Sequence, residues 1–319
     1  ARRLEAPPRP LIPAAPTPGL RRRQISLIIQ AGIAIVAIPG TRRTVGPMTG
    51  HWTLADIAWD RFDPGKVNAD LLSIVKAAAM VESNGRDYAL YLRGVFPDDH
   101  AFQKAADNWA EEEVQHGEAL GRWAMLADPA FSYAASLQRF RDGYRVPTGV
   151  DQSVRGSRTG ELIARCMVEV GTSSYYAALA DASEEPVLSE ICRRIATDEL
   201  RHYRLFYKNM KRYLDLEQLG LPRRLAVAVS RITETEDDEL AYAYHAANMG
   251  DRPYDRRASY RAYSRRAFPL YRPRHLDRAI GMIFKAVGLK PQGLLHRAMS
   301  RLAAFLVQNH ARRLARAAA

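Results

Sequence analysis

Cysteine is scarce in this sequence, and its scarcity excludes two classes of site. The 319 residues contain two cysteines, Cys166 and Cys192, and no Cys-x-x-Cys pair. Two cysteines are too few for a disulfide framework or a zinc ribbon, and the missing pair excludes a rubredoxin-type iron site. Such low cysteine usage is typical of a reducing compartment, so we expect a cytoplasmic protein.

Acidic residues are almost missing from the start of the chain. Residues 1–55 contain one acid, Glu5, and eight arginines, and the whole chain has a formal net charge of +12. This excess of positive charge favours an acidic partner, which is a nucleic acid, an anionic membrane or an acidic protein.

The first 47 residues differ in composition from the rest. Six prolines fall within the first 18 positions, and three arginines precede a short apolar run from Ile25 to Ile38. The run is too short to span a bilayer comfortably and resembles a signal sequence. The interpretation we favour is a disordered or non-native extension over 1–47. The remainder is then divided into a bundle over 48–215 and a basic helical region over 216–319.

Strand-like alternation does not persist anywhere after Val67, and apolar residues recur instead at helical spacing. The sequence therefore predicts an all-α protein. Four long helices, joined in two hairpins by a long link from Ala127 to Gly156, fit a ferritin-like four-helix bundle with one crossover. Their ranges are 67–94, 98–127, 154–183 and 186–214. Further helices over 222–249, 255–267, 274–287 and 291–316 either pack around the bundle or form a separate cap.

Two of the predicted helices carry the same polar interruption in an apolar stripe. In helix 98–127 the stripe is broken by Glu113 and His116, and in helix 186–214 by Glu199 and His202. The stripe residues step by three or four and so share a helix face. They are Phe102, Ala106, Trp109, Leu120 and Trp123 in the first, and Leu188, Cys192, Ile195 and Phe206 in the second.

The other two bundle helices each carry one glutamate on the apolar face. Glu82 lies 31 residues before Glu113, and Glu169 lies 30 residues before Glu199. These separations bring each pair to the same level of a helical hairpin. Glu82 is the weaker member because the Glu-Ser-Asn-Gly segment is poor helix sequence, and Asp87 is its alternative.

Six inward ligand-type side chains need a shared partner, because buried carboxylates are costly when nothing compensates them. Two divalent irons would balance the charge of four carboxylates, with each histidine giving one nitrogen. One Glu from each of two helices and Glu-x-x-His from each of the other two is the ligand pattern of di-iron carboxylate bundles. The predicted metal ligands are therefore Glu82, Glu113, His116, Glu169, Glu199 and His202.

At these motifs the chain resembles the ferritin-like superfamily, and most closely the soluble acyl-[acyl-carrier-protein] desaturases. The resemblance rests on Trp109–His116, "WAEEEVQH", on Asp198–His202, "DELRH", and on Glu169–Thr172, "EVGT". It implies a two-iron centre, proton delivery by Thr172, and Asp198 as the partner that fixes the tautomer of a ligand histidine. Cys166, Ser173 and Ala178 are candidates for an acyl channel, although core packing is their expected role.

The implied reaction is oxygen-dependent removal of hydrogen from an unactivated carbon of an acyl chain, and desaturation is favoured over hydroxylation. An external electron donor such as ferredoxin supplies the electrons, and the family suggests a homodimer. The basic, tyrosine-rich segment Asp251–His275 suits an acidic acyl carrier protein, with nucleic acid as the second choice. Open alternatives are a tRNA or quinone-ring hydroxylase, a rubrerythrin-like peroxidase, and an iron-storing or iron-binding protein without an organic substrate.

Overall fold

The computed structural model describes residues 51–234, 238–250 and 252–316, and these residues are helical without any strand. The predicted all-α class is confirmed, whereas the extension over 1–47 lies outside the described residues. The α-helices are α1 Ala69–Glu82, α2 Gly85–Val95, α3 His100–Ala127, α4 Tyr133–Gly143, α5 Arg158–Ala182, α6 Pro186–Glu217, α7 Leu221–Thr233, α8 Asp238–Asn248, α9 Arg256–Ala267, α10 Pro273–Val287 and α11 Leu294–Arg316. Short 3-10 turns are η2 Leu54–Asp56, η3 Trp59–Arg61, η4 Pro64–Lys66 and η5 Phe268–Leu270.

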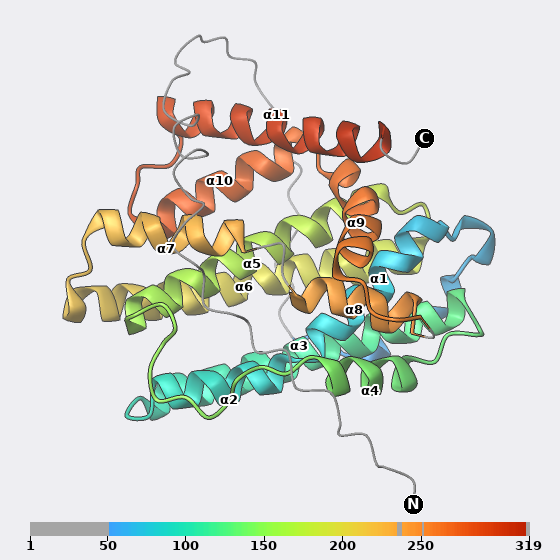
Figure 1. Cartoon of the computed structure of the whole chain (residues 1–319), viewed down its shortest axis with the longest axis horizontal. Helices are drawn as coiled ribbons and strands as arrows, with labels where there is room; N and C mark the ends of the chain where they lie inside the picture. Colours follow the sequence, from blue (N-terminus) through green and yellow to red (C-terminus); the bar gives the residue numbers. More distant parts are fainter. Residues whose placement is uncertain (1–50, 235–237, 251, 317–319) are drawn as a thin grey trace, which may run out of the picture.

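Helices α1, α3, α5 and α6 form the bundle. Helix α5 packs along α6, α1 packs on α3, and α3 also contacts α6 (Figure 1). Polar side chains cap the starts of these helices and accept otherwise unpaired backbone N–H groups: Asn68 caps α1, Asp99 caps α3, Ser157 caps α5 and Glu185 caps α6. The capping residues therefore lie at the start of each helix, away from its central turns.

The first bundle helix is not continuous, which corrects the prediction of one helix over 67–94. The chain breaks at Ser83 and Asn84, directly after Glu82, and α2 continues along α3. Ser83 donates its hydroxyl to the Ala79 carbonyl, and Asn84 donates to Glu239 on α8. The Ser83 bond is local and competes with regular helix geometry. The Asn84 bond is made to α8, so a long-range contact also contributes to the break.

Two further boundaries differ from the prediction. The link from Ala127 to Gly156 contains an unpredicted helix, α4, which packs against α8. The predicted helix over 222–249 is divided into α7 and α8. The other predicted helices agree with observed ones to within a few residues.

The C-terminal helices pack around the bundle. Helix α8 lies on α1, and α7 and α10 lie on α5. Helix α9 contacts α8, and α11 contacts α10 (Figure 1). Within the described residues, no helix combines the length and apolar character that crossing a membrane requires.

Two apolar clusters divide the bundle along its length. One contains Ile74, Leu120, Trp123 and Ile191, and the other contains Phe102, Leu162, Ile163 and Phe206. The central turns of α3, α5 and α6 lie between them. Any charged group held there is enclosed by apolar layers on both sides, which raises the free-energy cost of leaving it uncompensated.

Candidate metal centre

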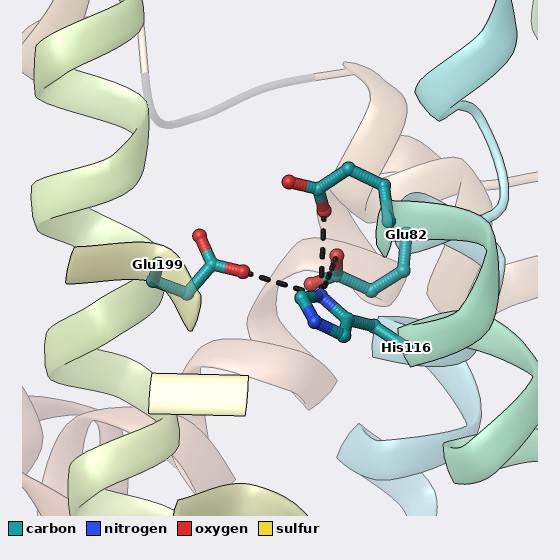
Figure 2. A group of neighbouring side chains, drawn as sticks. Glu82, His116 and Glu199 are labelled. Carbon is teal, nitrogen blue, oxygen red and sulfur yellow. Dashed lines mark ion pairs between the residues drawn. The ribbon is translucent and has the colours of Figure 1, made fainter. Parts of the chain in front are cut away.

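The six predicted ligand side chains meet between the two apolar clusters. Glu82 is the last residue of α1, whereas the others occupy central turns of α3, α5 and α6. All six are buried, with at most 7% of any residue exposed. Figure 2 shows Glu82 and Glu199 approaching His116 from different helices.

The side chains form two groups that share two members. Glu82, Glu113, His116 and Glu199 offer atoms within 4.8 Å of one another, and so do Glu113, Glu169, Glu199 and His202. Glu113 and Glu199 belong to both groups. The arrangement therefore provides two adjacent four-residue sets with a pair of carboxylates common to both.

Each shared carboxylate directs one oxygen towards each histidine. In Glu113, Oε2 is 3.7 Å from Nδ1 of His116 and Oε1 is 3.0 Å from Nδ1 of His202. In Glu199, the corresponding distances are 3.4 Å from Oε1 and 4.0 Å from Oε2. This is the disposition that bridging carboxylates of a two-metal site require.

The histidine rings are held from behind by other carboxylates. Nε2 of His116 lies 3.1 Å from Oδ2 of Asp198, and Nε2 of His202 lies 2.8 Å from Oε2 of Glu112. A hydrogen bond at Nε2 leaves Nδ1, the nitrogen facing the cluster, free to act as a ligand. Asp198 thus contacts a histidine of the cluster, as the resemblance implies, and Glu112 is the equivalent partner of the second histidine.

Five ligand-type atoms at the centre of the cluster make no hydrogen bond of acceptable geometry with the described residues, although carboxylates and imidazoles lie close together there. They are Nδ1 of His116 and of His202, both oxygens of Glu169, and Oε1 of Glu199. Buried polar atoms are nearly always hydrogen-bonded, so five orphaned ligand atoms in one place indicate a missing binding partner. Their chemistry, carboxylate oxygen with imidazole nitrogen, suits divalent iron, and the donor set therefore fits a di-iron group.

The buried carboxylates shift one another's pKa values. Burial, followed by the charge of Glu113, raises the pKa of Glu82 well above its usual range. Burial and the charge of Glu199 likewise raise the pKa of Glu169. Burial would also raise the pKa of Glu113, but the close approach of Glu82, His116 and His202 holds it well below its usual range.

Both histidines favour the protonated form. Burial alone would lower the pKa of each ring, but the surrounding carboxylates outweigh it and raise the pKa well above the usual value.

Asp198 is connected to groups nearer the surface. Oδ2 accepts a hydrogen bond of 2.7 Å from Nε1 of Trp52, and Oδ1 accepts one of 2.6 Å from Arg201. Burial would raise the pKa of Asp198, but the bond and charge of His116 and the charge of Arg201 lower it. Trp52 and Arg201 were not among the predicted site residues, and Trp52 precedes the helices in a segment without periodicity.

Two hydroxyl groups contact the glutamates directly. Thr172 donates to Oε2 of Glu199, and Tyr176 donates to Oε1 of Glu82. Thr172 thus stands beside a shared carboxylate. Tyr176 belongs to the apolar stripe of α5, and its hydroxyl contact was not foreseen.

Two alternatives left open by the sequence can now be decided. Glu82, and not Asp87, is grouped with the histidines among the described residues. Cys166, Ser173 and Ala178 are fully buried in the core and are not among the residues lining the cavity beside the site.

That cavity has a volume of about 470 Å³ and reaches the four glutamates. Its other walls are mainly apolar or aromatic and come from α1, α2, α3, α5 and the C-terminal helices, with Arg165, Arg231 and Glu239 as charged members. Wall residues beyond the site include Tyr263, Phe268, Leu276, Ile280, Ile283 and Val307. The cavity therefore joins the polar cluster to a mostly apolar compartment, a lining that is typical of small-molecule sites.

Residues 94–234 match the profile of the family described as Fatty acid desaturase. No curated protein matches the chain at a significant level. The matched segment contains both Glu-x-x-His motifs and Glu169, while Glu82 and the helices after α7 lie outside it.

Proposed function

We propose, from the confirmed resemblance of residues 94–234 to the fatty acid desaturases, that the protein is a di-iron, oxygen-dependent oxidoreductase acting on an acyl chain carried by an acyl carrier protein. Desaturation is the favoured outcome. The observation that carries the proposal is the pair of ligand sets sharing Glu113 and Glu199 at the end of an apolar cavity.

The balance of the reaction sets what the chain must provide. One dioxygen, two electrons from an external donor such as ferredoxin, and two protons would convert two adjacent methylenes into a double bond, with two waters formed. When bound by the six ligands, two irons would supply the dioxygen activation that side chains alone do not provide. The protein supplies orientation, exclusion of water and protons.

Several side chains match these tasks. Asp198 and Glu112 orient the histidines through Nε2. Thr172 lines the cavity and donates to Glu199, so its hydroxyl is suited to hold a proton at the edge of the reacting end. The apolar wall keeps water away and would hold the acyl chain against the carboxylates.

The C-terminal basic segment suits the carrier. Arg256, Arg257, Arg261 and Arg265 are carried by α9, and each is largely or partly exposed. An acyl carrier protein is strongly acidic, and complementary charge would steer its approach. A homodimer remains the expected oligomer.

The test begins with iron stoichiometry. Purified protein is loaded anaerobically with ferrous iron, passed through size exclusion, and measured for iron per chain. We expect two irons per chain in a small oligomer, in agreement with the two ligand sets. Iron in large excess within a large particle would indicate storage, and absence of iron would contradict the metal assignment.

The second step identifies the reaction. Loaded protein is incubated with acyl carrier proteins bearing saturated chains, reduced ferredoxin and dioxygen, followed by intact-mass measurement. Loss of two hydrogens would support desaturation, and gain of one oxygen would assign hydroxylation. If the acyl carrier proteins stay unchanged but another class of substrate causes electron-dependent oxygen consumption, the acyl proposal is overturned. The proposed metal centre would not be affected by that result.

A further inference from the structure

Helix α11 lies on the outside of the C-terminal region. Figure 1 shows it (red) running across α10, on the side of the molecule away from α2, α3 and α4. It packs against α9, α10 and η5. His296 and Ser300 face inward and are buried, and Val307 reaches the cavity.

The opposite face of α11 is also apolar. Leu294, Leu295, Phe305 and Leu306 are 67%, 58%, 61% and 53% exposed. The spacing of eleven residues between Leu294 and Phe305, and between Leu295 and Leu306, is close to three helical turns, so both pairs lie along one strip. An exposed apolar strip on a helix that already has a packed inner face indicates a binding surface.

The charge around this strip has one sign. No Asp or Glu occurs from residue 278 to the end of the sequence, whereas eight Lys and Arg do. Five of them are exposed arginines on α11 itself: Arg297, Arg301, Arg312, Arg313 and Arg316. An outer face with leucines and phenylalanine beside arginines is typical of helices that lie in the interface of an anionic bilayer.

We infer that α11 is a peripheral membrane-docking helix whose outer strip enters the headgroup region of an anionic bilayer while its arginines contact lipid phosphates. The negative lipid phosphates would pair with the arginines, and the upper acyl region would receive the apolar strip. An acidic protein would satisfy the arginines without needing the strip. A second copy of α11 would bring like-charged arginines together, because a two-fold contact pairs the same patch with itself.

Docking in this way brings lipid to the helices that enclose the cavity. Val307 of α11, together with Ile280 and Ile283 of α10, belongs to the cavity wall. The helix proposed to rest on the bilayer is therefore also part of the compartment for the apolar ligand. This inference rests on the surface of α11 and stands independently of whether a metal is bound.

The first experiment places a probe on α11, so that its signal reports only the environment of this helix. This is needed because the apolar run Ile25–Ile38 could also bind a membrane. Leu306→Cys is labelled with an environment-sensitive NBD probe; Cys166 and Cys192 are buried and do not compete. We expect a blue-shifted emission and a several-fold rise in intensity with vesicles containing phosphatidylglycerol, weakened by salt, and no change with pure phosphatidylcholine. The matched control, Val154→Cys, is 72% exposed on a loop and is expected to show no change. An unchanged Leu306→Cys signal would overturn the inference.

The second experiment removes the strip. In vesicle co-sedimentation, the double variant Phe305→Ser with Leu306→Ser is expected to bind anionic vesicles at least about tenfold more weakly than the parent chain. Val154→Ser is expected to bind like the parent, and unchanged circular dichroism would show that the variants are folded. Equal binding by the double variant would refute the role of α11. The inference would also be refuted if the parent chain bound no vesicles and the double variant lost a homodimer or the binding of an acyl carrier protein. That result would assign the strip to a protein partner.

Discussion

Glu113 and Glu199 occupy the central positions of the site, because one carboxylate oxygen of each faces His116 and the other faces His202. Replacing either by alanine removes a carboxylate from both ligand sets. We expect Glu113→Ala and Glu199→Ala to retain less than one iron per chain, measured after anaerobic loading and size exclusion, with helical content preserved. Replacing Glu82, which belongs to one set, is expected to cost less iron than either.

Glu111 provides the control for these variants. It lies on the same helix, two residues from Glu113, but its side chain is 62% exposed and pairs with Arg86. Glu111→Ala is expected to bind two irons like the parent. Parental iron content in Glu113→Ala or Glu199→Ala would show that the ligand assignment is wrong.

Metal binding is expected to release protons. The pKa values of Glu82, Glu169 and both histidines are raised, so these groups retain protons at a pH at which ordinary side chains have lost them. A metal ion must displace those protons, and its apparent affinity therefore rises as the pH rises. Calorimetry with manganese in two buffers of different ionisation enthalpy measures the number released, and affinity that falls with increasing pH would contradict the prediction.

The clustering of the six candidate ligands could be predicted from the sequence because a helical period of 3.6 residues assigns each one to a buried stripe. Residues outside that period were harder to assign. Glu112 lies beside the stripe, and its bond to His202 depends on the approach of α3 to α6, which helix phase does not report. Trp52 reaches Asp198 across 146 residues from a segment without a repeating pattern.

Among the helices, the contact of α1 with α3 positions Glu82 and depends on Gly117. A Cβ atom at this position would lie 2.5 Å from Oγ of Ser83 and 3.0 Å from the Ala79 carbonyl oxygen. We expect Gly117→Ala to lower the free energy of unfolding by about 1–3 kcal/mol through overpacking, as measured by urea denaturation.

Gly171 makes a matched comparison within α5. A Cβ atom there meets nothing within 4 Å. Gly171→Ala is expected to raise stability by about 0.5–1 kcal/mol, because alanine loses less conformational entropy in a helix. Equal effects of the two substitutions would mean that close packing of α1 on α3 does not limit stability.

The same elements show where sequence patterns lose their predictive strength. The break after Glu82 is set partly by Glu239, a residue on α8 that accepts from Asn84 across the fold. Helix α4 has two buried residues, Ser136 and Phe140, so its apolar repeat is too weak to distinguish it from a loop. Long helices with a full buried stripe were predictable, and short helices stabilised by distant contacts were not.

For the molecule as a whole, the buried ligand cluster couples metal binding to stability. A metal that binds the folded chain and not the unfolded one stabilises it by mass action. With ferrous iron at about one hundred times its dissociation constant, we expect the melting temperature to rise by roughly 5–10 °C.

This shift is measured anaerobically by circular dichroism. Glu113→Ala serves as the control, since it retains the fold but loses a shared ligand. A rise of equal size in that variant would show that iron stabilises the protein at some other place, and no rise in the parent chain would argue against a metal centre in the cluster.

The contribution of α11 to the cavity wall has a consequence for the order of biosynthesis. The last ligand, His202, is synthesised more than a hundred residues before Val307, and the wall residues of η5 and α10 also follow it. A nascent chain that has folded its bundle contains all six candidate ligands before the C-terminal helices that line the cavity are made. If the cluster binds metal as proposed, the ion would be able to enter from this side before those helices cover the apolar compartment.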